Sequence, residues 1–220
     1  MKGAGTFLSM GERPIQEDHV LVKEDRGLIL VADGFGGSLS GLETARLAND
    51  SIVHFVGRQS QDEEATMPFE LRGHLTWDAN ILGNAVLHAN REILKWNQKR
   101  SAQARGGASV VAARVRQKHL CVCSVGNASS WLLREGESKA LTHPKSLGLF
   151  EDPFMGWGKP GRQIPLLSLG THERLEPEIL EVRIEEGDWL VLHSDGVWPD
   201  VIEELGRLQR KNLEFEASLR

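Results

Sequence analysis

The chain has 220 residues, of which 40% are hydrophobic and 26% charged, and its formal net charge at pH 7 is -5. This length and composition predict a single domain spanning 1–220 with a core of its own, and the scattered basic residues argue against a nucleic-acid-binding surface. The apolar runs are too short to cross a bilayer and the first residues lack a signal-peptide pattern, so we expect a cytoplasmic protein, taken as a monomer, without membrane contact. Two cysteines cannot form a disulfide scaffold.

Strand-like patterns come first along the chain, at residues 6–9, 19–23 and 27–32. From Leu42 the apolar residues recur three or four apart, which predicts a helix with Ala45, Ala48, Ile52 and Phe55 on one face. A polar, acidic connector follows at 60–66. Pro68 is expected to open a second helix, whose apolar stripe comprises Leu71, Leu75, Leu82, Val86, Ala89, Ile93 and Trp96. The two helices should pair as a layer against a sheet.

The second half returns to strands, at 109–115, 120–125, 130–134 and 139–141, which we interpret as a meander of antiparallel hairpins. Residues 143–165 show no period and form an ordered, flap-like excursion. Its residues Phe154, Met155 and Trp157 either contact a partner or fasten the loop to its own domain. Residues 179–184 and 189–193 are expected to form a hairpin, and the chain from Pro199 should be helical.

Two aspartate–glycine pairs, Asp33–Gly34 and Asp195–Gly196, each follow a strand-like run. If each strand stops at its glycine, the aspartate lies at the rim of a sheet, where its oxygens can reach a hard divalent cation. The alternative is that each pair is an ordinary turn. Two such carboxylates predict one shared metal site.

Five sequence blocks occur in the order found in metal-dependent protein phosphatases, and the chain resembles the protein phosphatase 2C family. They lie at residues 13–18, 33–37, 106–109, 126–129 and 187–196, so the resemblance covers nearly the whole chain. It implies an α+β fold with a central antiparallel β-sandwich flanked by helix layers on both faces. It also implies two Mn²⁺ or Mg²⁺ ions and a phosphoserine or phosphothreonine protein as substrate.

The resemblance also implies the roles of single residues. Asp33 would bridge the two ions, the Gly34 carbonyl would complete one coordination sphere, and Asp195 would hold the second ion. A water bridging the ions would then attack the phosphorus directly, without a covalent enzyme intermediate.

Three further residues belong to the expected site. Glu17 and Asp18 would accept hydrogen bonds from metal-bound waters or bind a metal themselves. Arg13 would clamp the phosphate oxygens as a planar, two-pronged donor. The alternative is a solvated arginine followed by a polar turn.

The chain also departs from the family pattern. Asn127 stands where many members have an aspartate that helps to hold a third, weaker metal, and Phe35 stands where many have a histidine. Nothing after Pro199 supplies the Asp–Asn of the usual final strand pair, so we expect that strand pair to be missing. Two functions therefore stay open: an active metal-dependent serine/threonine phosphatase, or a pseudophosphatase that binds or regulates a partner in signalling. A phosphohydrolase acting on small phosphate esters is a third.

Overall fold

The computed structural model describes residues 3–9, 11, 14–37, 39–59, 67–156 and 163–218. Two of the residues singled out above, Arg13 and Trp157, and the connector at 60–66 lie outside this part of the chain.

Alternating apolar residues build two antiparallel sheets. The first has the order β1-β2-β3-β4-β7, formed by β1 (Asp18–Lys23), β2 (Leu28–Gly36), β3 (Gly106–Arg116), β4 (His119–Val125) and β7 (Glu178–Arg183). The second has the order β6-β5-β8, formed by β5 (Ser129–Arg134), β6 (Glu137–Ala140) and β8 (Trp189–His193). Because successive side chains of a strand point to opposite faces, each sheet can pack on two neighbours at once.

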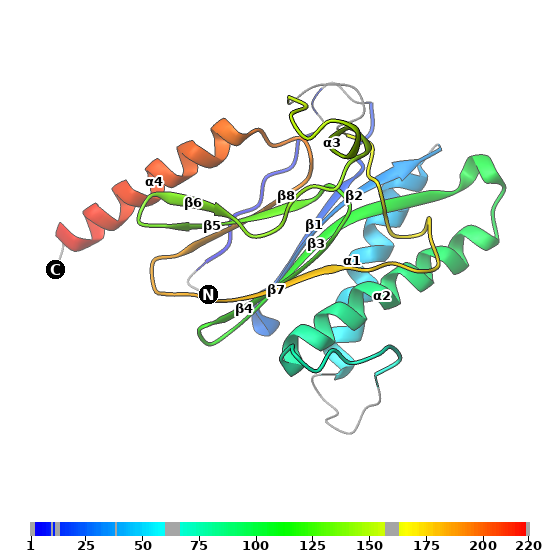
Figure 1. The fold of residues 1–220 in the computed structure, drawn as a ribbon, viewed down its shortest axis with the longest axis horizontal. Coiled ribbons are helices and arrows are strands. Elements are labelled where there is room, and N and C mark those ends of the chain that lie inside the picture. The colour runs from blue at the N-terminus through cyan, green and yellow to red at the C-terminus, as the bar shows by residue number, and fades with distance from the viewer. Residues whose placement is uncertain are drawn as a thin grey trace.

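The two sheets lie face to face between helices, as Figure 1 shows. The paired helices α1 (Ser40–Gln59) and α2 (Trp77–Gln98) cover the first sheet, and α4 (Pro199–Ser218) covers the second. One hydrophobic core fills the space between the helix pair and the first sheet, and it includes Leu30, Ile52 and Val110. A second core lies between the sheets, with Val31 and Val111 from the first sheet and Leu190 from the second. The layers therefore follow the order α-β-β-α.

The helix α4 is fastened to the second sheet by one buried side chain, that of Gln209. Its Nε2 donates hydrogen bonds of 2.7 Å to the carbonyl oxygens of Leu133 and Gly187, and its Oε1 accepts one of 2.9 Å from the backbone N–H of Gly136. The side chain is fully buried. A polar residue in the helix thus satisfies backbone groups at two separate turns.

Several expected elements take a different form in the structure. Residues 6–9 have no strand pairing. Pro68 does not open a helix, because α2 begins only after Thr76, whose hydroxyl accepts a hydrogen bond from the N–H of Ala79 and caps the helix. The predicted hairpin of residues 179–193 is also wrong: β7 pairs with β4 in the first sheet, whereas β8 pairs with β5 in the second.

The excursion at 143–165 contains one short helix, α3 (Leu147–Glu151), and otherwise lacks regular structure where it is described. Phe154 is 96% exposed, so its ring does not fasten the loop to the rest of the protein. Among the residues that the structure describes, no helix has the length and apolar character needed to cross a membrane.

Candidate metal centre

Two of the predicted carboxylates lie directly opposite each other on neighbouring strands. Asp18 on β1 pairs with Asp33 on β2, and Asp33 pairs with Ser109 on β3. Because opposed residues of an antiparallel pair share a face, all three side chains lie on the same side as Val31, which belongs to the core between the sheets. The register thus brings a row of oxygen atoms to one end of the sandwich.

The strand β2 continues through Asp33 and Gly34 to Gly36, so this pair is not a turn. Gly34 is needed for a different reason: a Cβ at this position would overlap the carbonyl oxygen of Gly41 in the first turn of α1. Its N–H donates a 3.1 Å hydrogen bond to the carbonyl oxygen of Glu17, and the Glu17 carboxylate lies against Gly41. The absence of a side chain at 34 and 41 therefore lets strand, helix and Glu17 meet beside Asp33.

Asp195 comes from the other sheet, in the turn that follows β8. The preceding residue joins the two sheets, because the hydroxyl of Ser194 donates a 3.2 Å hydrogen bond to Oδ2 of Asp18. From the other side, Nδ2 of Asn127 lies 3.4 Å from Oδ2 of Asp195, and Oδ1 of Asn127 accepts a 3.2 Å hydrogen bond from the Ser109 hydroxyl. Side chains from both sheets are thus linked in one polar network.

A buried histidine holds the same turn. The Trp131 indole donates a 3.1 Å hydrogen bond to Nε2 of His193, while Nδ1 of that ring lies 2.6 Å from the carbonyl oxygen of Ser194. Since an indole N–H can only donate, the imidazole proton is on Nδ1. Burial lowers the pKa of His193, although the Ser194 carbonyl and Asp195 favour its charged form. A neutral ring therefore fixes the backbone next to Asp195.

The network includes residues to which the sequence analysis gave no positioning role: Ser109, Ser194 and His193. Their positions in the sequence indicate a place near the site, because Ser109 lies in the block at 106–109 and His193 and Ser194 directly precede Asp195–Gly196. Their partners on distant strands could not be known from the sequence.

The donor chemistry at this end of the sandwich suits Mg²⁺ or Mn²⁺, because carboxylate and carbonyl oxygens are the ligands that these ions prefer. Within the described residues, no group of three or more His, Cys, Asp or Glu side chains is already close enough to hold a metal ion. Carboxylates that share a site repel one another, and a cation would favour a closer approach. The described residues therefore supply suitable ligands for these ions, but they do not form a complete coordination sphere.

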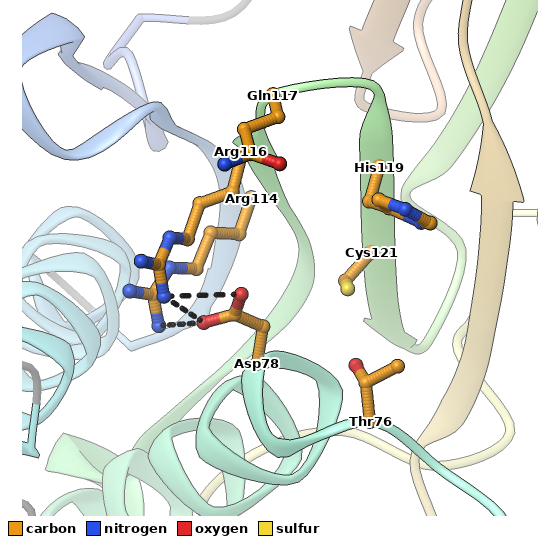
Figure 2. Close-up of a pocket in the computed structure, with 7 residues that line it drawn as sticks. All are labelled: Thr76, Asp78, Arg114, Arg116, Gln117, His119 and Cys121. Carbon is orange, nitrogen blue, oxygen red and sulfur yellow. Dashed lines mark hydrogen bonds and ion pairs between the residues drawn. The ribbon is translucent and has the colours of Figure 1, made fainter.

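A pocket of about 250 Å³ lies at the other end of β3, roughly 17 Å along the strand from Ser109. In Figure 2 the Asp78 carboxylate points toward the guanidinium groups of both Arg114 and Arg116, with closest distances of 3.1 and 3.2 Å. Arg114 is only 5% exposed, and its burial lowers its pKa although Asp78 opposes this. We interpret the charged residues that line this pocket as an ion-pair cluster with a structural role.

Comparisons with known proteins agree with this arrangement. No family model matches the chain. The chain is 25% identical over 183 residues to the serine/threonine phosphatase stp of Listeria monocytogenes, covering 80% of this chain and 68% of that protein. It is 26% identical over 186 residues to the protein phosphatase PhpP of Streptococcus pneumoniae, covering 82% and 71%.

Solved structures show the same fold. The serine/threonine phosphatase of S. agalactiae superposes with a TM-score of 0.70 at 21% identity, covering 90% of this chain and 81% of that one. The catalytic domain of the phosphatase PstP, in complex with two manganese ions, gives 0.66 at 23% identity, covering 87% and 78%. The predicted similarity to metal-dependent protein phosphatases of the protein phosphatase 2C type is confirmed by the sequence relatives, and the α+β sandwich fold class is confirmed by the solved structures.

Proposed function

We propose that the chain is a metal-dependent serine/threonine protein phosphatase, acting on proteins that carry phosphoserine or phosphothreonine. The observation that carries this proposal is the arrangement of Asp18, Asp33 and Asp195, which strands of two different sheets bring to one end of the sandwich. The similarity to bacterial phosphatases supports the reaction class. From the length, composition and motifs of the sequence we also propose a single domain over 1–220, a monomer, a cytoplasmic location and a role in signalling.

The proposed cofactors are two Mn²⁺ or Mg²⁺ ions, as in the PstP complex. Asp33, Asp195 and the Gly34 carbonyl would hold these ions, and Glu17 and Asp18 would bind them directly or through metal-bound waters. Such ions supply positive charge that attracts a phosphate dianion, and they lower the pKa of water to near neutrality.

The protein's own residues restrain the carboxylates in this arrangement. The strand register fixes Asp18 opposite Asp33, and the Ser194 hydroxyl restrains the Asp18 carboxylate from the second sheet. Restraint of ligands by outer hydrogen bonds is worth about 10–100-fold in metal affinity or activity. Arg13, proposed from its motif to clamp the phosphate, lies outside the described residues.

The first experiment is hydrolysis of p-nitrophenyl phosphate and of a phosphothreonine peptide, each with and without millimolar Mn²⁺. We expect Mn²⁺-dependent turnover of both substrates, reduced more than about 100-fold in Asp33→Asn, since even outer ligand partners contribute up to about that much. The matched control is Asp25→Asn. Asp25 is an exposed carboxylate in the short 3-10 helix at the far end of β1, and this variant should behave as the wild type.

The alternative function is a pseudophosphatase, favoured by the neutral Asn127 at a position where many members of the family have an aspartate. It predicts a folded wild-type protein that binds the phosphopeptide without hydrolysing it. Turnover of p-nitrophenyl phosphate alone would instead indicate a phosphohydrolase for small esters.

A further inference from the structure

We infer that Asn127 is a positioning residue that orients the Asp195 carboxylate and connects it to Gln163, at the base of the loop at 143–165; this rests on the proposed function of that site. In many members of the family an aspartate at this position helps to hold a third, weaker metal, and from that pattern alone the asparagine would be interpreted only as a poorer ligand. In this chain the amide has a different task, because its N–H groups bind two acceptors at once.

The Asn127 side chain lies in a buried position and all its polar atoms have partners. Its Nδ2 is 2.8 Å from the carbonyl oxygen of Gln163 and 3.4 Å from Oδ2 of Asp195. Its Oδ1 accepts a hydrogen bond from the Ser109 hydroxyl, which in turn accepts one of 3.3 Å from the Asn127 backbone N–H. Asn127 and Ser109 are 3% and 2% exposed, so water cannot readily replace these partners.

Only one orientation of the amide satisfies these contacts. A flipped amide would direct Oδ1 toward a carbonyl oxygen and a carboxylate oxygen, neither of which can donate to it. The Ser109 hydroxyl holds Oδ1 on the opposite side and thereby fixes both Nδ2 hydrogens toward Gln163 and Asp195.

The Gln163 carbonyl belongs to the base of the loop. This base is tied to the residue before Asn127, since the N–H of Lys145 donates a 2.9 Å hydrogen bond to the carbonyl oxygen of Gly126. The N–H of Leu147 donates to the Ile164 carbonyl, and that of Leu166 to the Lys145 carbonyl, at 2.8 and 2.9 Å. One side chain therefore contacts both the carboxylate and the segment that closes the loop.

An aspartate at 127 would reverse these interactions. An acceptor oxygen in the place of Nδ2 would then face both the Gln163 carbonyl and the Asp195 carboxylate, and even the protonated acid could donate to only one of them. Two negative charges this close together would disfavour the ionised form of both carboxylates. If Asn127 were simply an impaired ligand, in contrast, an aspartate would improve metal binding.

These opposite expectations give the test. We would compare the wild type, Asn127→Asp, Asn127→Ala and the control Asn212→Asp, which adds the same charge at an exposed position on α4. Mn²⁺ binding would be measured by calorimetry, and backbone amide exchange over 143–156 by mass spectrometry. The exchange measurement needs neither metal nor turnover, so it still tests the Asn127 link if the wild type is inactive and the proposed function fails.

We expect Asn127→Asp to weaken Mn²⁺ binding about tenfold, as loss of an outer hydrogen bond does, and to accelerate exchange in the loop. Asn127→Ala should accelerate loop exchange as well, and it keeps the test valid if the aspartate variant does not fold. Tighter Mn²⁺ binding by Asn127→Asp, or unchanged loop exchange in Asn127→Ala, would overturn the inference.

Discussion

Replacing Gln209 by leucine tests whether hydrogen bonds, rather than packing alone, hold α4 on the second sheet. Leucine retains most of the buried volume but leaves the carbonyl groups of Leu133 and Gly187 and the N–H of Gly136 without their partner. A protein hydrogen bond contributes about 1 kcal/mol net, and an unsatisfied buried group costs about 1–3 kcal/mol. Two of the three contacts are only partly buried, where water can substitute, so we expect a loss of about 2–3 kcal/mol in the free energy of unfolding.

Urea unfolding followed by far-ultraviolet circular dichroism measures this loss, with Gln98→Leu as the matched control. Gln98 is exposed at the end of α2, so the same substitution there should change the free energy of unfolding by less than about 0.5 kcal/mol. If Gln209→Leu were as stable as the control, apolar packing would suffice to hold α4, and the argument from buried polar groups would be refuted.

Other predictions concern packing, buried charge and pH. Gly34→Ala should lower the free energy of unfolding by about 3 kcal/mol or more, because the new Cβ overlaps the first turn of α1, whereas Gly73→Ala, with open space around it, should be neutral in the same urea titration. Asp78→Asn should destabilise by about 3 kcal/mol because it removes a carboxylate from the buried Arg114, while Arg116→Gln, at a 62% exposed side chain, should cost less than about 1 kcal/mol; equal losses would contradict this. Burial lowers the pKa of three histidines, which are His19, His88 and His193. Below about pH 6.5 the unfolded chain therefore binds more protons than the folded one, so the urea midpoint should fall as the pH drops from 7 toward 5.5. The fall should be smaller in His88→Gln, which lacks one of the three groups.

Much of the fold could be predicted because periodicity is a local property. The apolar face of α1 and the strands β3, β4 and β5 follow the patterns seen in the sequence. Pairing is not local, and this explains why the hairpin of residues 179–193 was wrong. The turn at 185–188 looks like a hairpin turn, yet β7 finds its neighbour in the first sheet and β8 in the second.

The candidate site shows the same division. Asp33 and Asp195 could be selected from the sequence because a carboxylate and a glycine after an apolar run form a local motif. The roles of Ser194 and His193 could not, since Ser194 contacts Asp18 from a position 176 residues away, and Trp131 meets His193 only across paired strands. The residue type at 127 indicates only a poorer metal ligand, whereas the contacts of Asn127 support the positioning role that we infer.

The crossing of the chain from one sheet to the other between Arg183 and Trp189 has a thermodynamic consequence. Asp33 is part of the first sheet and Asp195 follows the last strand of the second, so an ion bound by both would connect the two halves of the sandwich. A ligand that binds only the assembled form stabilises it by about 2.7 kcal/mol at a concentration 100 times its dissociation constant. In this protein that free energy would act on the interface between the sheets. Metal affinity and the packing of Val31 and Val111 against Leu190 would then both depend on one equilibrium, the assembly of the two sheets.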